Sequence, residues 1–177
     1  ITQDCTFTVD PYSYEITVDG VDEETKLLMQ DALNVGDNGK NLYKHIYYCS
    51  TQDGCESTQI TKESKMKYEA YHQVYSYTGY ELDKLEEKNG TYYTESGENI
   101  LDLVNHAVED TGKVPKEYKQ QMKNWIHDLV STMSVKGWNN VSDMTLSILY
   151  GKSGLKDMNQ LITYQYEAGS MNRQWYS

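Results

Sequence analysis

The chain has 177 residues and a formal net charge of −11, with 27 acidic residues, 16 basic residues and 17 tyrosines. This length is sufficient for a domain with a real core, and the many aromatic side chains argue against a disordered chain. A single arginine and a strong acidic excess exclude the usual basis of nucleic-acid binding, which is a set of Lys and Arg contacts to phosphates. We therefore expect one compact domain over residues 1–177 that binds no nucleic acid.

The first half of the chain is predicted to be rich in strands. Alternating residues over 6–9 and 12–18 indicate an N-terminal hairpin that turns at Asp10-Pro11. Further strands are expected over 41–48 and 65–77, where apolar and aromatic side chains occupy both faces. Asn89-Gly90 before Thr91 is typical of a two-residue hairpin turn.

Helices are predicted mainly in the second half, with one helix earlier in the chain. Asp22 is suited to cap a helix that runs to about Val35, with Leu28, Ala32 and Val35 on one face. Helical spacing of apolar residues then predicts four further helices, over residues 96–112, 115–137, 142–150 and 155–167. A chain that is strand-rich over 1–95 and helix-rich over 96–170 predicts an α+β fold, with an antiparallel sheet and the C-terminal helices packed on one face.

The helix over 115–137 has the clearest apolar periodicity of the chain. Pro115 suits the first turn of a helix, and Gly137 suits the residue that closes it. We expect this helix to be the central packing helix, with its apolar face buried against the sheet through Trp125, Ile126 and Leu129. An exposed Trp125 would instead indicate an interface or a membrane surface.

Three cysteines give two hypotheses about covalent links. Cys49 and Cys55 flank a short loop with an Asp-Gly turn that could bring their sulfur atoms within disulfide distance. Cys5 is then left over, and an odd cysteine in a secreted protein indicates either a bond to a second chain or a free thiol. The alternative is that all three cysteines are reduced and structural.

Several features favour a secreted, extracellular protein. The chain starts at Ile1, which is typical of a mature chain whose leader was removed, or of a trimmed fragment. Asn89 and Asn140 each begin a triplet that is typical of N-glycosylation. No run of residues has the length and apolar character of a membrane-spanning helix.

Few features of the sequence indicate catalytic or metal-binding residues. His106 and Asp110 are four residues apart on a predicted helix and could bind a metal, but no second paired histidine accompanies them. We predict no catalytic residue, no metal and no cofactor. The predicted strand over 65–77 carries a possible binding surface for a glycan or protein, since aromatic side chains beside carboxylates are typical of carbohydrate sites, and this surface consists of Tyr68, Tyr71, Tyr75 and Tyr77.

These features lead to three functional hypotheses. The first is a secreted toxin-like or effector protein that acts on other cells or on membranes at acid pH, with a possible partner chain linked through Cys5. In layout, though without a shared motif, such a protein is similar to the secreted killer toxins of yeasts, which are small, processed from precursors and often two-chained. The second is a secreted or surface binding module that recognises a cell-surface glycan or protein through the tyrosines. The third is a small secreted hydrolase.

Overall fold

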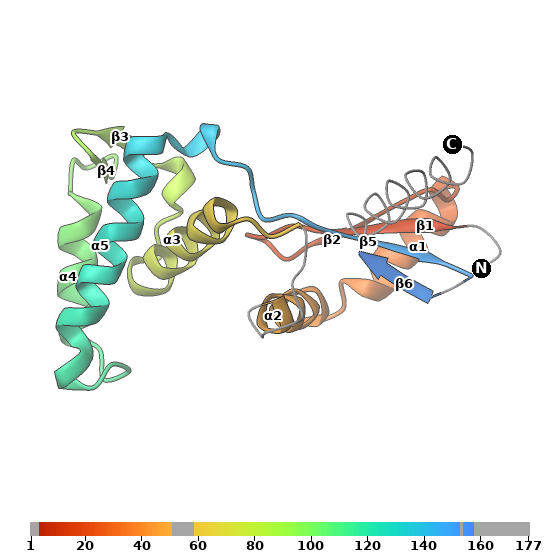
Figure 1. Cartoon of the computed structure of the whole chain (residues 1–177), viewed down its shortest axis with the longest axis horizontal. Helices are drawn as coiled ribbons and strands as arrows, with labels where there is room; N and C mark the ends of the chain where they lie inside the picture. The colour runs from red at the N-terminus through yellow and green to blue at the C-terminus, as the bar shows by residue number, and fades with distance from the viewer. Residues whose placement is uncertain (1–3, 51–58, 153, 158–177) are drawn as a thin grey trace, which may run out of the picture. The chain divides into compact units, whose positions relative to one another are not determined.

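The computed structural model describes residues 4–50, 59–152 and 154–157. Strands and helices are labelled in Figure 1 in their order along the chain. The elements are β1 (Cys5–Val9), β2 (Ile16–Asp19), α1 (Glu23–Leu33), α2 (Asn38–Ser50), α3 (Lys62–Thr78), η1 (Leu82–Lys84), β3 (Glu86–Lys88), β4 (Thr91–Tyr93), α4 (Ile100–Asp110), η2 (Lys116–Tyr118), α5 (Lys119–Lys136), η3 (Trp138–Asn140), β5 (Leu146–Gly151) and β6 (Gly154–Asp157).

The chain divides into two compact units, each described by itself below. Unit 1 comprises Ile1–Thr61 and Met144–Ser177, and unit 2 comprises Lys62–Asp143. Two segments distant in sequence therefore meet in unit 1, whereas unit 2 is continuous. The expectation of one compact domain over the whole chain stays a prediction.

Unit 1 contains a four-stranded antiparallel sheet in the order β2-β1-β5-β6. Pairing of Phe7 with Val18 on one side and with Ile148 on the other places these three side chains on one face of the sheet. This face is apolar and mostly buried, through Cys5, Val9, Ile16, Val18, Leu146 and Ile148. Thr8 pairs with Ser147 on the opposite face, which is lined mainly by hydroxyl groups.

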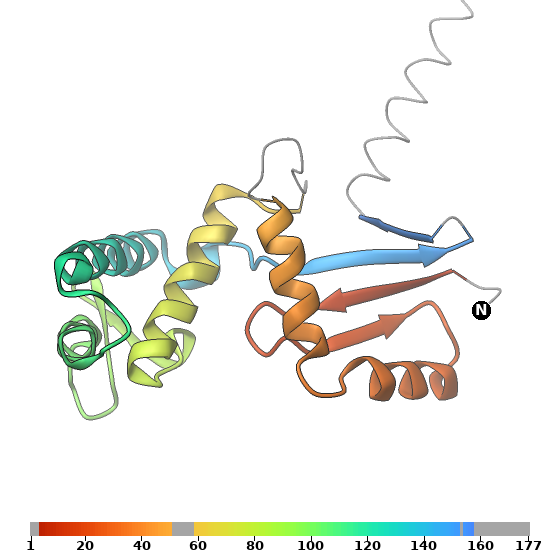
Figure 2. The same ribbon diagram turned by 90° about the horizontal axis from the view of Figure 1, so that it is seen from below.

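Helix α1 lies beside the outer edge of the sheet, next to β2 (Figure 2). Its side chains satisfy the backbone groups that an edge strand leaves without a partner strand. The Gln30 amide accepts a hydrogen bond from the backbone N–H of Val18 at 2.9 Å. The Asn34 amide accepts from the N–H of Ile16 at 2.8 Å and donates to its carbonyl oxygen at 2.9 Å. Two side-chain amides thus take the place of a further strand along β2.

The side chain of Gln59 has the same role on β5. Its amide accepts from the N–H of Ser147 at 2.7 Å and donates to the carbonyl oxygen of that residue at 2.9 Å. Pairing of β5 with β6 covers only residues 148–151 of β5, so Gln59 supplies the partner at the position that β6 does not reach.

Helix α2 packs on the apolar face of the sheet through a close backbone contact and a buried tyrosine. A Cβ atom at Gly39 would clash with the carbonyl oxygen of Tyr14 and would lie 3.3 Å from Cγ1 of Ile16. Tyr43 is fully buried, and its hydroxyl donates a hydrogen bond to the carbonyl oxygen of Met144. Glycine is therefore needed at position 39 for the helix to approach the hairpin turn.

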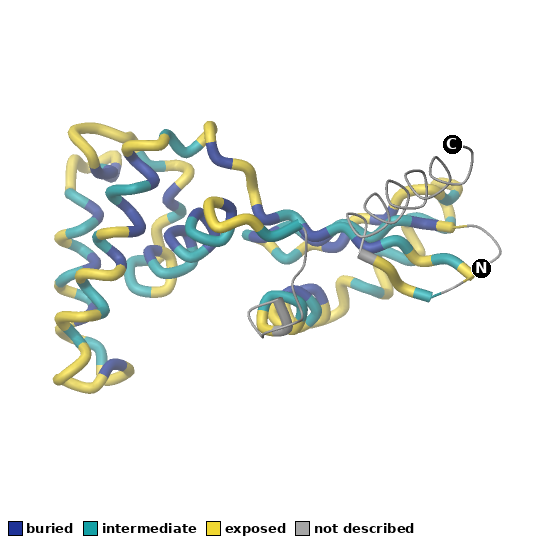
Figure 3. The backbone as a smooth tube through the Cα atoms, viewed as in Figure 1, coloured by how far each residue is buried: buried dark blue, intermediate teal, exposed yellow. Residues whose placement is uncertain are grey.

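Unit 2 consists of α3, α4 and α5, which pack on one another, and of the hairpin β3–β4, which contacts α4 and α5 through β4. Buried and exposed positions alternate along the three helices at helical spacing (Figure 3). The core of this unit is built from aliphatic and aromatic side chains that include Ala70, Val74, Tyr92, Ile100, Val104, Val108, Ile126, Val130 and Met133.

One charged side chain lies in the core of unit 2. Lys67 on α3 is almost fully buried, and its Nζ donates to the carbonyl oxygen of Val141 at 2.7 Å. The same atom is 2.8 Å from Oδ1 of Asp143 and 4.7 Å from the centre of the Trp138 ring. These contacts connect the start of α3 with the segment that follows α5, and so hold the two ends of the unit together.

The predicted α+β class with an antiparallel sheet is confirmed. Strands β1 and β2 come from the N-terminal half of the chain, but β5 and β6 come from its C-terminal half, and the helices occur in both halves. The N-terminal hairpin and the turn at Asn89-Gly90 are confirmed by the pairing of β1 with β2 and of β3 with β4. Asp22 caps α1 by accepting from the N–H of Thr25, and Gly137 closes α5. Among the core predictions, Ile126 and Leu129 are buried.

Three predicted elements are wrong, and a fourth is wrong in its first residues. Residues 41–48 belong to helix α2 and residues 65–77 to helix α3, whereas residues 146–150 of the predicted helix over 142–150 belong to strand β5. Aromatic and β-branched residues favoured strands in the first two segments, but packing selects helices there because the buried positions recur every three or four residues. The predicted helix over 155–167 begins instead with strand β6, and its remainder lies outside the described residues.

The prediction that Trp125 is a core residue is also wrong. Its side chain is 36% exposed, whereas Ile126 beside it is fully buried. Consecutive residues of a helix point about 100° apart, so both cannot lie at the centre of the same buried face. The buried face of α5 follows Ile126, Leu129, Val130 and Met133, and it packs on α3 and α4.

Candidate functional sites

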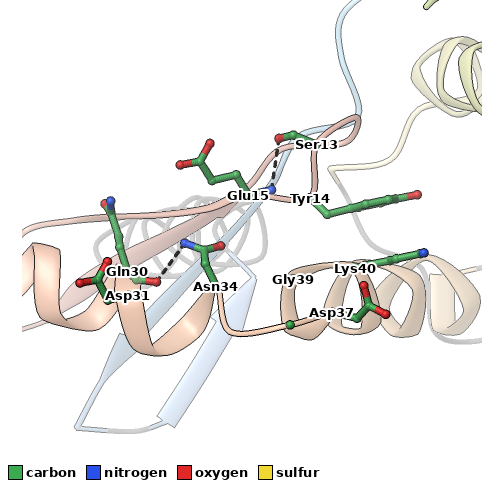
Figure 4. A pocket seen from close by; sticks show the side chains of 10 residues that line it. Ser13, Tyr14, Glu15, Gln30, Asp31, Asn34, Asp37, Gly39 and Lys40 are labelled. Carbon is green, nitrogen blue, oxygen red and sulfur yellow. Dashed lines mark hydrogen bonds between the residues drawn. The ribbon is translucent and has the colours of Figure 1, made fainter. Parts of the chain in front are cut away.

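Unit 1 contains a pocket between the β1–β2 turn and the helices α1 and α2 (Figure 4). Its volume is 610 Å³, and its lining is mostly polar. Figure 4 shows the carboxylates of Glu15, Asp31 and Asp37 at separate places around it, with Lys40 near the last of them. No pair of carboxylates therefore converges in the way that acid–base catalysis on a glycoside requires.

Most of the uncharged polar groups of this pocket already serve the fold. The amides of Gln30 and Asn34 bind the backbone of β2, and the hydroxyl of Ser13 donates to Asp10 and accepts from the N–H of Glu15. Tyr14 has a φ of 63°, an uncommon conformation for a bulky residue, and its ring meets that of Tyr43 edge-on at 5.4 Å. The conformation of Tyr14 thus has a structural explanation in the turn and in the contact with α2.

Unit 2 contains a second pocket, which we call the tyrosine pocket, between the end of α3, η1 and the loop after β4. It is lined by Tyr75, Gly79, Tyr80, Glu81, Lys84, Leu85, Thr94, Glu95 and Ser96. Its volume is 690 Å³, and it has more apolar surface than the pocket of unit 1. Tyr75 and Tyr80 are 49% and 39% exposed, so two aromatic rings lie beside two carboxylates at an open surface.

The ring of Tyr75 is supported from behind by a buried tyrosine. The rings of Tyr71 and Tyr75 are nearly parallel, with an interplanar angle of 8° and a centre-to-centre distance of 6.2 Å. Tyr71 is itself 7% exposed and also contacts His72 and Trp138. A ring held by such packing loses little conformational freedom when a ligand binds to it.

The predicted tyrosine surface is therefore divided by the helix. Tyr68 and Tyr71 are buried, Tyr77 is partly buried and Tyr75 is exposed. Burial raises the pKa of the Tyr77 phenol. Of the four predicted residues only Tyr75 lines the tyrosine pocket, because residues 65–77 form a helix and not a two-faced strand. Sequence reasoning missed Tyr80 and Glu95, and only the Gly79-Tyr80 step after a helix could have pointed to the first of them.

Two charged groups at the rim of the tyrosine pocket bind each other. Lys84 of η1 forms an ion pair with Glu81, three residues earlier. The hydrogen bond to Glu81 and the charge of that carboxylate raise the pKa of Lys84. Glu95 has no such cation among the described residues, so it is the carboxylate of this pocket that is available to a ligand.

Of the predicted cysteine sites, the structure describes the surroundings of Cys5. Cys5 is a free thiol that is 1% exposed in β1, and burial, together with the charge of Asp4, raises its pKa. A bond from Cys5 to a second chain would require β1 to open, and such a bond stays a prediction. The predicted disulfide between Cys49 and Cys55 lies outside the described residues and side chains.

Both predicted glycosylation positions are exposed. Asn89 is at the tip of the β3–β4 hairpin with a φ of 54°, and Asn140 ends η3. The side-chain amide of Asn140 donates to the carbonyl oxygen of Lys136 at 2.9 Å. A glycan at Asn89 could project from the turn without disturbing a side-chain hydrogen bond among the described residues, and modification at either residue stays a prediction.

Histidine chemistry receives little support from the geometry of the described residues. His106 and Asp110 are both exposed on α4, and Nε2 of His127 is hydrogen-bonded to Asn105 at 3.0 Å. Within the described parts of the chain, no group of three His, Cys, Asp or Glu side chains is arranged to hold a metal ion. In the same residues, no helix combines the length and the apolar character that crossing a membrane would require.

Comparison with known proteins identifies a family but no activity. The chain is 31% identical over 160 residues to "Uncharacterized protein YbdO" of Bacillus subtilis (strain 168), an alignment that covers 90% of this chain and 40% of that protein. The chain therefore spans less than half the length of this curated relative. No solved structure matches the chain. Residues 2–176 match the family model described as "Domain of unknown function (DUF4885)", and the chain belongs to this family.

Proposed function

We propose that the chain is a binding module that recognises a glycan through the tyrosine pocket of unit 2. The observation that supports this function is the pair of exposed rings, Tyr75 and Tyr80, beside the carboxylates of Glu81 and Glu95. Aromatic faces pack against the apolar side of a sugar ring, and carboxylates accept hydrogen bonds from its hydroxyl groups. The stacked contact between Tyr71 and Tyr75 supports this assignment further, because it orients one ring in advance.

The pocket of unit 1 is the weaker candidate for the same function. Its amides are committed to β2, and its only aromatic ring, Tyr14, packs against Tyr43. In the tyrosine pocket, by contrast, the exposed rings and Glu95 are not needed to close a sheet edge. A ligand there would not have to compete with contacts that hold the unit together.

Screening with oligosaccharides tests this proposal directly. The full chain would be titrated with a panel of neutral and amino-sugar oligosaccharides, and binding would be followed by ligand-observed NMR. We expect Tyr75→Ala to weaken binding at least about tenfold, which corresponds to about 1.4 kcal/mol. Tyr118→Ala is the matched control, since Tyr118 is 55% exposed but lies outside the pocket. Equal losses in the two variants, or binding of no oligosaccharide, would contradict the proposal.

A toxin-like or effector role is the second candidate, and the exposure of Trp125 favours it. Tyr118 and Val135 on the same stretch of chain are 55% and 82% exposed, so apolar side chains are presented to solvent around α5. Such side chains could contact a membrane whose repulsion by the acidic chain weakens at acid pH. Leakage of dye from liposomes at acid pH, lost in Trp125→Gln and retained in Gln121→Ala, is the expected result. An absence of leakage at any pH would contradict a membrane-directed role.

A further inference from the structure

Helix α1 is attached to the edge of the sheet by polar side chains, and part of its apolar surface is exposed to solvent. The side chains directed to the sheet edge are Lys26, Gln30 and Asn34, which recur every four residues. Lys26 pairs with Asp19 at 3.1 Å, and the two amides bind Val18 and Ile16. The helix is thus attached to β2 by an ion pair and hydrogen bonds at successive turns, and none of its residues is buried.

Some apolar residues lie on the side of α1 away from the sheet edge, whereas Met29 and Leu33 are half-buried. Leu28 is 66% exposed and Val35, just after the helix, is 64% exposed, with Ala32 exposed between them. Leu27 is also 53% exposed. Helical geometry places residues 28 and 32 about 160° from the mean direction of residues 26, 30 and 34. We call Leu28, Ala32 and Val35 the outer face of α1; Leu27 lies about 20° from Asn34 around the helix axis and does not belong to it.

This arrangement differs from that of an ordinary surface helix. An amphipathic helix normally buries its apolar stripe and exposes its polar residues, because burial of aliphatic side chains contributes most of its stability. Here the contacts that attach α1 to β2 are made by polar side chains and not by Leu28, Ala32 or Val35. Contiguous exposed aliphatic side chains are typical of a surface that another molecule covers.

The charges around the outer face indicate what kind of molecule covers it. Glu24 and Asp31 are exposed on α1, whereas its single cation, Lys26, is paired with Asp19. A second copy would bring two such acidic surfaces together, and the chain carries a net charge of −11. An anionic membrane would be repelled for the same reason. A partner with apolar side chains flanked by Lys or Arg satisfies both the apolar stripe and its acidic border.

We propose that the outer face of α1 is a docking surface for a basic amphipathic helix of a partner polypeptide. The partner places its apolar stripe over Leu28, Ala32 and Val35 and its cations opposite Glu24 and Asp31. This mode of recognition uses helix packing in which apolar anchors supply affinity and charges supply orientation. It leaves the bonds between α1 and β2 intact.

Titration of the full chain with a synthetic helical peptide tests the proposal. The probe is a Leu/Lys amphipathic peptide of about 18 residues, long enough to form a helix on binding. The control peptide keeps every lysine but has glutamine in place of leucine. The combined variant Leu28→Gln with Val35→Gln should weaken binding at least about tenfold, and Glu24→Gln with Asp31→Asn should weaken it severalfold. Leu155→Gln, at a residue that is 61% exposed on β6, should leave it unchanged.

Each remaining outcome overturns the proposal. Equal affinity for the two peptides, or undiminished binding to the variant with Leu28→Gln and Val35→Gln, would show that only charge attracts the probe. A dimer detected by analytical ultracentrifugation and lost in that variant would assign the face to a second copy. Flotation with phosphatidylcholine or phosphatidylglycerol vesicles that depends on Leu28 would assign it to a lipid surface.

Ala32→Lys, at another exposed residue, provides a second test, because it should also weaken binding of the cationic peptide.

Discussion

Helix α1 of unit 1 and helix α5 of unit 2 show two opposite ways of attaching a helix. α5 buries Ile126, Leu129, Val130 and Met133 against other helices. Its Lys119 and Lys123 lie outside this face and pair with Glu109 of α4. α1 buries no residue and is attached by Lys26, Gln30 and Asn34 to the edge of a strand. The difference teaches that hydrogen-bonding side chains can attach a helix to a sheet edge, which leaves part of its apolar surface, Leu28, Ala32 and Val35, exposed for binding.

The largest expected effect concerns Lys67, the charged side chain in the core of unit 2. Lys67→Ala removes a buried cation that binds Val141 and Asp143, and leaves a cavity beside Trp138. We expect the free energy of unfolding to fall by about 3 kcal/mol, near the lower end for breaking a buried pair because Asp143 is 46% exposed. Urea denaturation of the full chain measures this change.

Lys67→Met is the matched control, since it keeps most of the side-chain volume while it removes the charge and the hydrogen bond to Val141. It should cost less than Lys67→Ala, because it leaves little or no cavity beside Trp138. Equal costs for the two variants would mean that the ionic contacts carry the whole effect. A cost below about 0.5 kcal/mol for both would contradict a core role for Lys67.

The next effect concerns a close backbone contact of unit 1, between Gly39 and Tyr14. Gly39→Ala introduces a Cβ atom where the carbonyl oxygen of Tyr14 lies, so α2 must move away from the hairpin turn. We expect a loss of about 2 kcal/mol in the free energy of unfolding, as for an overpacked core position. Gly112→Ala is the control, because a Cβ atom there would meet nothing within 4 Å. Similar values for the two variants would show that α2 does not approach the turn this closely.

A smaller effect is expected at a buried phenol of unit 2. The hydroxyl of Tyr92 is buried without a hydrogen-bond partner among the described residues. Burial, and to a lesser degree the charge of Glu87, raises its pKa to about 12 from the ordinary value of 10.0. Tyr92→Phe removes a polar atom without a partner, so it should leave stability at neutral pH unchanged or raise it by up to about 1 kcal/mol.

The unfolding free energies of the wild type and of Tyr92→Phe should depend differently on pH. Because the folded pKa of Tyr92 lies above the unfolded value, its contribution to stability is full below about pH 10 and is lost as the pH rises toward 12. Between about pH 9 and pH 11 the wild type should therefore lose more unfolding free energy than Tyr92→Phe. Parallel losses would show that the Tyr92 phenol ionises as readily in the folded chain as in the unfolded one.

Local signals were sufficient to predict part of the fold. The Asp22 cap, the Asn89-Gly90 turn and the closing Gly137 depend on backbone chemistry within a few residues, and the structure contains all three. Segments 41–48 and 65–77 were predicted incorrectly because tyrosines suit both strands and helices. Their helical spacing, such as Tyr68, Tyr71 and Tyr75, was present but was outweighed by strand propensity.

The candidate sites could be predicted only in part, because the segments that form them are distant from one another along the chain. Tyr75 was identified as a surface residue, but the tyrosine pocket also needs Glu95 from the loop after β4. The inverted orientation of α1 depends on its position beside β2, which pairs with β1 and not with a further strand on its outer side. Neither relation is contained in the periodicity of any one segment.

The unfolding free energies of Asn34→Ala and Leu28→Gln test the orientation of α1 most directly. Asn34→Ala removes two hydrogen bonds to Ile16 and should cost about 1–2 kcal/mol. Leu28→Gln changes a residue that is 66% exposed and should cost less than about 0.5 kcal/mol. The predicted result is the larger loss at the polar residue. A larger loss at Leu28 would show that α1 is attached by its apolar side and would contradict both the orientation of α1 and the docking surface inferred from it.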